Sequence, residues 1–530
     1  MSRLKLVDLV SSGIAWTVAL FVGGVLVLAS ASLPANTSAT KASALGSLGA
    51  SCQASGPKSC IASILDAMGG RKSLESVNLL HLELVSHTQV AEQSYRQEPF
   101  LTSDAHTTAI LDLKGRRVYR KVEITWPESD PGAATISQVV VAGPDGGVRR
   151  GAKADQPCSL SDIEAARDAL GLLPVNVLLD AANANDLHFE APIMLRSTSH
   201  LVLGFTSLGQ SKRILINSFN LSLDAIDTTT QFHDFWFYWG DVERRIYFDN
   251  WKFFHGFRFP TNTVEERNQL LWRTTQILDL EVNGQLDESL FQMDAAAKQQ
   301  SLAARGFEVP FKLGETKDLA PEVTLLVGPW NATIIKQDDG VLILECPLSS
   351  EYVSGIISEV KRRYPGTPIK AVLSTSDSWP HVGGIRQVVA EGIPVYALDL
   401  NLPLLDRLVH APHIQAPDLL AQHPKQPKWQ TVGQTINIGQ DQNRLQLYPL
   451  RGVSTERQYM VYFPERKLLY ASDTLSINDD GSLYDPELMY EVVQAVQREH
   501  LEVLTVYAMH QGPTPWSQVE SLVRTAVSPR

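Results

Sequence analysis

Two kinds of sequence pattern follow each other along this 530-residue chain. From Leu79 to about residue 283, short β-like runs rich in Val, Ile, Phe and Tyr alternate with turn residues, and one helical stretch interrupts them at residues 162–182. From residue 322 onward, wholly apolar strand-like runs alternate with helical segments. We therefore expect an α+β protein: an antiparallel β meander with covering helices, followed by a layered α/β domain.

Length and composition indicate a multidomain globular protein. Hydrophobic residues make up 44% and charged residues 20% of the chain, which is too long for one ordinary core. The net charge of −12 leaves no basic surplus for phosphates, so no nucleic-acid partner is expected. The basic run DLKGRRVYRK is expected on a solvated face. The predicted divisions are residues 1–31, 32–59, 60–295, 296–321 and 322–530.

The N-terminal residues 1–31 read as a signal peptide or a membrane anchor. Arg3 and Lys5 precede an apolar stretch at residues 13–30, and Ala29 and Ala31 have the spacing of a signal-peptidase site. The stretch is just long enough to span a bilayer, which takes roughly 20 residues. We expect the domains to be exported, either free in the periplasm or held at the membrane facing it.

Residues 32–59 are rich in Ala, Ser, Gly and Thr and are predicted to be a flexible linker. In an oxidising compartment, Cys52 and Cys60 would close a small disulfide loop. Cys346 ends a very apolar run and is expected to be a buried thiol. Residues 296–321 are polar and partly helical and are predicted to connect the two domains.

The most aromatic part of the chain is the run at residues 235–239, FWFYW, followed by Trp251. One interpretation is a packed sheet core. Another is a ligand groove, because a strand alternates its faces and five consecutive aromatic side chains cannot all point inward. On that second interpretation, Trp236, Tyr238 and Trp251 are candidate substrate-binding residues.

The stretch GDVERRIYFDNWKFFHGFRFPTNTVEE contains one strand that leads through GFRFP into another. In this it resembles the periplasmic lipoprotein-carrier family, whose unclosed half-barrel with helical lids holds acyl chains. The resemblance covers roughly residues 62–290 and implies a half-barrel that binds an apolar or acylated molecule. A purely structural role for this domain is the alternative.

Four segments after residue 322 resemble the metallo-β-lactamase superfamily in the right order. They are DDGVLILECP, STSDSWPHVGGIRQVVAEGIPVYA, LRGVSTERQYMVYFPERKLLYASDTL and VYAMHQGP. The resemblance implies a four-layer αβ/βα sandwich with a metal site at one sheet edge, and a hydrolase. The loop that normally carries H-x-H-x-D-H is the second of these segments.

When the metal ligands of this superfamily are carried over position by position, only some of them are present in this chain. Serines stand where the family has the histidines of its first metal site: Ser376, Ser378 and Ser454. Pro380 stands where the family has an Asp, and Asp377 is the nearest carboxylate. Three ligands of the second site remain: His381, Asp473 and His510.

A serine hydroxyl is a poor zinc ligand, so at most one divalent metal is expected, Zn²⁺ first, with Mn²⁺ or Fe²⁺ as alternatives, or none. The leading hypothesis is an exported hydrolase-like protein with a degenerate site, acting on an unidentified small or lipid-like molecule. One alternative is an inactive periplasmic binding protein for an apolar or acylated ligand. The other is a metal-free hydrolase in which the three serines, His381 and Asp473 supply nucleophile, base and orienting group.

Overall fold

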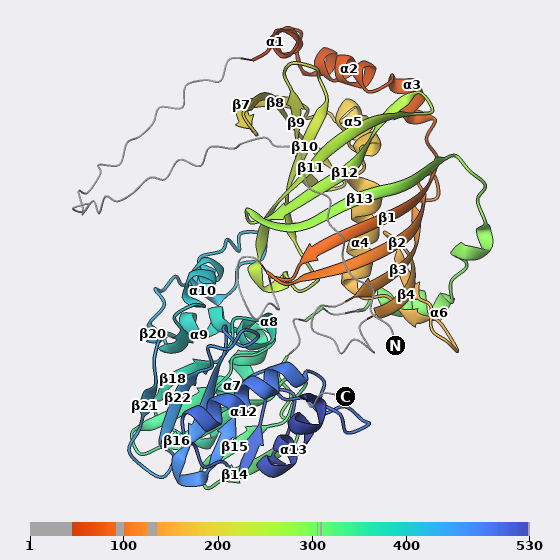
Figure 1. Ribbon diagram of the computed structural model, residues 1–530. Coiled ribbons are helices and arrows are strands. Elements are labelled where there is room, and N and C mark those ends of the chain that lie inside the picture. The colour runs from red at the N-terminus through yellow and green to blue at the C-terminus, as the bar shows by residue number, and fades with distance from the viewer. Residues whose placement is uncertain (1–44, 92–99, 126–134, 305, 308–309, 528–530) are drawn as a thin grey trace, which may run out of the picture. The chain divides into compact units, whose positions relative to one another are not determined.

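The computed structural model describes residues 45–91, 100–125, 135–304, 306–307 and 310–527 (Figure 1). The predicted signal peptide or anchor at residues 1–31 lies outside these ranges. Residues 44–530 form one compact unit. Within the described ranges, no helix is both long enough and apolar enough to cross a membrane. The domain boundaries proposed from the sequence stay predictions.

Part of the predicted flexible linker is helical. It contains α1 (Ser47–Ala54) and the start of α2 (Pro57–Ala67), which is followed by α3 (Arg71–Glu75). A small residue of this segment packs closely against the sheet domain. Gly49 donates its N–H to Ser218 O at 2.8 Å, and a Cβ at this position would clash with Ser218. A disulfide joins Cys52 to Cys60, so the predicted pairing is confirmed.

The predicted meander is confirmed as one antiparallel sheet of thirteen strands. Its order is β6-β5-β4-β3-β2-β1-β13-β12-β11-β10-β9-β8-β7. Consecutive strands therefore pair, except β6 and β7, which form the two edges, and β1 also pairs with β13. The strands are β1 (Leu79–Gln89), β2 (Thr102–Asp112), β3 (Arg117–Thr125), β4 (Thr135–Gly143), β5 (Gly146–Arg149), β6 (Gln156–Pro157), β7 (His188–Leu195), β8 (Thr198–Ser207), β9 (Gln210–Asn217), β10 (Leu223–Gln231), β11 (Asp241–Phe254), β12 (Phe257–Arg267) and β13 (Leu270–Val282).

Two helices cover one face of this sheet, which curves around them (Figure 1). They are α4 (Leu160–Gly171) and α5 (Pro174–Asn183), where the sequence predicted one helical stretch. A capping box starts α4: the Ser159 hydroxyl accepts from the Asp162 N–H, and the Asp162 carboxylate accepts from the Ser159 N–H. Both helices contribute apolar side chains to the core that the sheet shares with α2.

The aromatic run does not form the expected strand. Residues Phe237–Trp239 form a 3₁₀ turn, η1, in the connection between β10 and β11. Its rings therefore do not alternate between two faces, and Trp236 and Tyr238 are both buried. Trp251 lies on β11, where its indole N–H donates to Phe248 O at 3.1 Å. Packing thus accounts for all three of these side chains.

The second half contains two further sheets, with mixed strand directions. The first has seven strands in the order β14 to β20: β14 (Thr316–Ala320), β15 (Val323–Leu326), β16 (Ala332–Gln337), β17 (Gly340–Leu344), β18 (Ile369–Ser374), β19 (Val395–Leu398) and β20 (Trp429–Val432). The second has six strands in the order β21 to β26: β21 (Ile436–Ile438), β22 (Leu445–Pro449), β23 (Tyr459–Phe463), β24 (Leu468–Tyr470), β25 (Thr505–Tyr507) and β26 (Thr514–Pro515).

These two sheets face each other across a shared apolar layer, and helices cover their outer faces. On β17, Leu342 and Leu344 point into the shared layer while Val341 and Ile343 point to the helices. Burial on both faces explains why the strands read as unbroken apolar runs. The covering helices are α7 (Ser350–Arg363), α9 (Ile385–Glu391) and α10 (Leu402–Val409) on the first sheet, and α12 (Pro486–Arg498) and α13 (Trp516–Val527) on the second.

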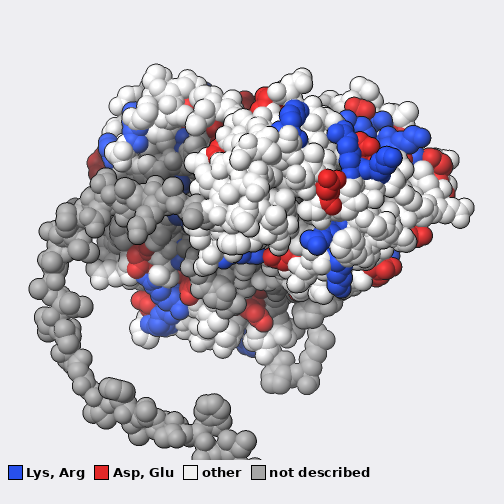
Figure 2. Space-filling model, turned by 90° about the horizontal axis from the view of Figure 1, so that it is seen from above, with Lys and Arg blue, Asp and Glu red and all other residues white. Residues whose placement is uncertain are grey.

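The remaining elements are short: η2 (Glu288–Phe291), α6 (Ala295–Ser301), α8 (Trp379–Val382), α11 (Leu419–Gln422) and η3 (Pro464–Arg466). On the face drawn in Figure 2, basic and acidic side chains of the described residues are interspersed between uncharged areas.

Candidate functional site

The predicted site residues lie where strands of the two smaller sheets end. Glu345 follows β17, and Thr375 follows the parallel strand β18. Asp473 lies shortly after β24, and His510 shortly after the parallel strand β25. Because parallel neighbours end at the same sheet edge, each pair is brought together by the fold. His381 enters the same place from α8.

His381 is enclosed between two carboxylates. Its Nδ1 lies 2.9 Å from Glu345 Oε2, and its Nε2 lies 3.6 Å from Asp473 Oδ2. The side chains of His381 and Glu345 are both 0% exposed. Burial alone would lower the pKa of His381, but the Glu345 carboxylate and Asp473 raise it to about 10. The two carboxylates therefore favour the imidazolium form of His381, which is a poor general base.

Hydroxyl groups contact Glu345, the carboxylate beside Nδ1 of His381. The hydroxyls of Thr375 and Tyr470 both donate to its Oε1, the latter at 3.0 Å. Thr375 Oγ1 is in turn 2.6 Å from Ser472 Oγ. Glu345 and Ser472 have φ angles of 76° and 56°, a left-handed conformation that side-chain-bearing residues rarely adopt. The backbone therefore adopts an unfavourable conformation at both residues, where their side chains join one hydrogen-bonded cluster.

Asp473 joins His381 to His510. The Asp473 Oδ1 lies 2.9 Å from His510 Nε2, and these two side chains are 25% and 35% exposed. Burial alone would raise the pKa of Asp473, but its contacts with the two histidines hold that pKa well below the usual range for Asp. The network therefore runs from the buried Glu345 outward to a histidine that solvent reaches.

The three predicted serines take no part in this network through their hydroxyls. Ser376 Oγ accepts from the Ser378 N–H at 3.3 Å, and the buried Ser378 Oγ has no hydrogen-bond partner among the described residues. The Ser454 N–H donates to the Glu491 carboxylate at 3.0 Å. Across the described residues, no hydrogen bond links a hydroxyl of these serines to the side chain of any histidine. Their catalytic roles stay predictions.

Asp377, the nearest carboxylate to the position of the missing ligand, is engaged elsewhere. It forms an ion pair with Arg457 at 2.7 Å, and both side chains are less than 5% exposed. The two residues are 80 positions apart in the sequence, in the loop after β18 and the turn before β23. This pair fixes the loop against the second sheet and leaves the carboxylate committed to a cation of the chain itself.

The side chains predicted as metal ligands lie close to one another. Each ring nitrogen of His381 is within ion-pair distance of a carboxylate oxygen, but neither forms a hydrogen bond with any of the described residues. Both oxygens of Asp473 are directed at histidines. Within the described ranges, no group of three or more His, Cys, Asp or Glu side chains has the geometry to hold a metal. The predicted set His381, Asp473 and His510 is connected by ion pairs, and its role as a metal site stays a prediction.

A second candidate site is a cavity of about 580 Å³ in the large sheet. Its walls come from β1 to β4, β11 to β13 and α4. Most of the wall is apolar, and five arginines also line it: Arg120, Arg149, Arg244, Arg267 and Arg273. Phe232, Phe235 and Trp272 are its aromatic contacts besides two phenylalanines on β11 and β12. The predicted binding residues Trp236, Tyr238 and Trp251 are not part of its lining.

Two side chains of these sites, Glu345 and Arg120, were not among the predicted site residues, although the sequence contains a weak signal for each. Glu345 is a carboxylate that directly follows the apolar run VLIL, a position that predicts a buried charge. Arg120 belongs to the basic run that was expected on a solvated face, yet it lines the cavity. It does so because residues on a strand point alternately to the two faces, so one basic run supplies both.

Neither a protein-family model nor a curated protein matches this sequence. Solved structures that resemble it include a stereoselective inverting sec-alkylsulfatase from Pseudomonas sp., at 15% identity, with 39% of this chain and 40% of that chain covered and a TM-score of 0.30. A metallo-β-lactamase from Pontibacter korlensis matches at 16% identity, with 40% and 98% covered and a TM-score of 0.31. One from Erythrobacter litoralis matches at 14% identity, with 41% and 99% covered and a TM-score of 0.31. The chain thus spans about 40% of the alkylsulfatase.

Proposed function

We propose that the protein binds an apolar or acylated small molecule in the cavity of its large sheet. The single observation that carries this proposal is the cavity itself, whose volume of about 580 Å³ lies within the range of small-molecule sites. Apolar side chains from several strands of the sheet line it, including Leu82 of β1, Leu111 of β2, Val140 of β4 and Ile277 of β13. An apolar wall of this kind is stabilised when a ligand displaces water from it.

A cavity-filling variant tests the proposal. Ala165 lies on α4, lines the cavity and is only partly buried, so Ala165→Phe would place a ring in the empty space. Purified wild-type protein is expected to bind a fluorescent acyl probe and to release a lipid on solvent extraction. Ala165→Phe should lose both, while Ala62→Phe, an exposed alanine on α2, should keep both. Wild-type protein that neither carries lipid nor binds the probe would contradict the proposal.

A second candidate function is hydrolysis at the edge of the smaller sheets, in a fold of metallo-β-lactamase type. The four-layer order of helices and sheets supports that fold. The observation that favours hydrolysis is the Asp473–His510 pair, because a carboxylate 2.9 Å from a solvent-accessible histidine is the usual support of a general base. His381, which is held as a cation, would only fix the position of Asp473.

This second candidate predicts activity that depends on His510. A panel of ester, thioester and phosphodiester substrates should reveal a reaction in the wild type that His510→Ala reduces by about 10²-fold or more. His423→Ala, at an exposed histidine remote in sequence, is the matched control. Equal rates in all three proteins would remove hydrolysis through His510 as a function.

We also propose that the protein is exported. The Cys52–Cys60 disulfide supports this, since such bonds persist in oxidising compartments. A fusion of residues 1–50 to a reporter that is active only after export tests the idea. An inactive reporter would contradict it, and salt or carbonate extraction of membranes would separate a cleaved signal peptide from an anchor.

A further inference from the structure

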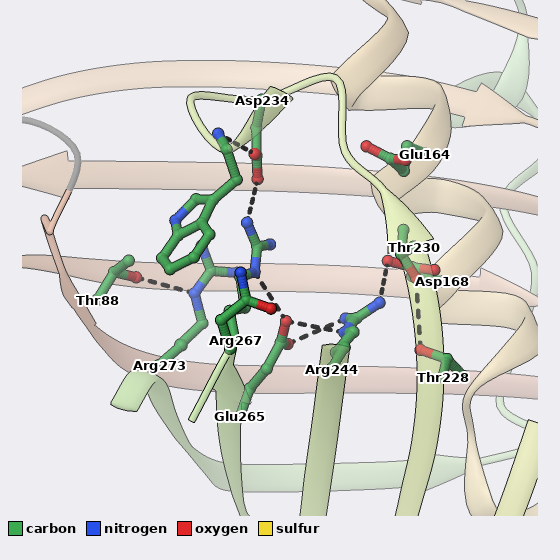
Figure 3. A network of polar contacts seen from close by, with 12 residues as sticks. Thr88, Glu164, Asp168, Thr228, Thr230, Asp234, Arg244, Glu265, Arg267 and Arg273 are labelled. Carbon is green, nitrogen blue, oxygen red and sulfur yellow. Dashed lines mark hydrogen bonds and ion pairs between the residues drawn. The ribbon is translucent and has the colours of Figure 1, made fainter. Parts of the chain in front are cut away.

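One end of the cavity is a network of buried ion pairs (Figure 3). Arg244 of β11 lies 2.6 Å from Asp168 of α4 and 2.8 Å from Glu265 of β12. Arg267 of β12 lies 2.8 Å from Asp234 and 3.2 Å from the same Glu265. Two arginines thus meet three carboxylates here, and the positive charges of both are compensated inside the network.

Arg273 of β13 reaches into the same space without such a partner (Figure 3). Its Nε donates to the Thr88 hydroxyl at 2.8 Å, and its guanidinium lies 3.9 Å from the centre of the Trp272 ring. Within the described part of the chain, no carboxylate lies within ion-pair distance of it. A neutral hydroxyl and an aromatic face leave most of the guanidinium donors open.

Arg120 of β3 is the second under-compensated cation of the lining. Its nearest carboxylate, Asp162, is 3.7 Å away and is already held by Arg149 at 2.5 Å. Burial lowers the pKa of Arg120, and burial likewise lowers the pKa of Arg273 to about 10. The more distant carboxylates Glu265 and Asp234 raise the pKa of Arg273, whereas Arg267 and Arg120 lower it. Both groups remain charged at neutral pH, and each raises the cost of the other's charge.

The cavity is polar at one end and apolar at the other. Side chains two residues apart on a strand share a face, so each wall strand contributes a series to the lining. The side chains change from charged to apolar along the two strands that flank β12: Arg244, Ile246 and Phe248 on β11, and Arg273, Thr275 and Ile277 on β13. Four residues of strand span about 13 Å, which is the length over which the polarity changes.

We propose that the cavity binds a long-chain fatty acid, with its carboxylate at Arg273 and Arg120 and its alkyl chain along the apolar wall. This inference rests on the proposed ligand-binding function and names the ligand's charge and class. A carboxylate would satisfy the open guanidinium donors with charge-assisted hydrogen bonds. A neutral lipid would fill the same space but would leave Arg273 without a counter-charge and Arg120 sharing Asp162 with Arg149, which costs free energy in a site of low dielectric.

The test compares an acid with its own ester. The full chain is titrated with a fluorescent polyene fatty acid and with the methyl ester of that acid, which has the same chain and no charge. We expect the wild type to bind the acid at least tenfold more tightly than the ester. Arg273→Gln and Arg120→Gln should each weaken binding of the acid by about tenfold to a hundredfold and leave the ester unchanged.

Arg196→Gln is the matched control, because Arg196 is a half-exposed arginine of the same sheet that is paired with Asp249. Far-UV circular dichroism verifies that the variants fold, and either cavity variant that folds suffices. Equal affinity for acid and ester, unchanged in the folded variant, would overturn this inference and leave the proposed binding function standing. Failure of the wild type to bind either molecule would overturn both.

Discussion

Replacing His381 by Gln should strongly destabilise the protein, because the Glu345 carboxylate would then be buried without its cation. Both side chains are 0% exposed, and the ring nitrogen lies 2.9 Å from the carboxylate oxygen. Breaking a buried ion pair by removing one partner costs about 3–5 kcal/mol. The hydroxyls of Thr375 and Tyr470 still donate to Glu345 in the variant, so we expect a loss near the lower end, about 3 kcal/mol.

The measurement is urea unfolding, followed by tryptophan fluorescence and by far-UV circular dichroism, for a double-mutant cycle. The cycle consists of the wild type, His381→Gln, Glu345→Gln and the double variant. The double variant buries no unpaired charge, so its loss in free energy of unfolding should be smaller than the sum of the two single losses by at least about 1 kcal/mol. His423→Gln, at an exposed histidine, should change stability by no more than about 0.5 kcal/mol.

A small loss in His381→Gln would refute this reasoning. If the single variant loses less than about 1 kcal/mol, Glu345 cannot be a buried anion that depends on this cation. Strict additivity of the two substitutions would lead to the same conclusion, because residues in one ion-pair network couple whereas independent sites add.

Three other outcomes follow from the structure. Burial raises the pKa of the Cys158 thiol to about 12 and that of Cys346 well above its usual value, so thiol reagents at pH 8 should label neither in the native protein and both in urea, where the thiolate forms near pH 8.5. Gly383→Ala should cost about 1–3 kcal/mol, since a Cβ there would stand 1.9 Å from Leu348 O, whereas Gly512→Ala meets no atom within 4 Å and should be near neutral by thermal denaturation. Ser159→Ala should cost about 0.5–2 kcal/mol in the same assay, because it removes the N-cap of α4.

Patterns that depend on local spacing could be predicted from the sequence. The helical segments expected between the apolar runs after residue 322 are present and include α7 and α12. The strand-like runs from Leu79 onward form a single antiparallel sheet. Apolar periodicity and turn residues carry this information because they act over a few neighbouring positions.

Features that depend on distant partners could not be predicted in this way. The aromatic run at residues 235–239 has strong β propensity, yet its surroundings bury it as a turn. The partner of Asp377 is Arg457, and nothing near either residue in the sequence indicates the other. Arg120 and Arg273 come from strands that are far apart in sequence, and only the pairing of β1 with β13 brings their walls together.

The same three residues can be interpreted as metal ligands or as links in a chain of charges, and the presence of Glu345 favours the second interpretation. His381, Asp473 and His510 alone would leave an imidazole nitrogen and carboxylate oxygens free to bind a cation. The structure adds a buried carboxylate on the far side of His381, which together with Asp473 favours the protonated ring. A positive charge is thus supplied within the chain, and Asp473 is oriented toward His510 by an imidazolium. Replacing Glu345, the carboxylate that follows β17, would test most directly whether His381 acts as a cation within the chain.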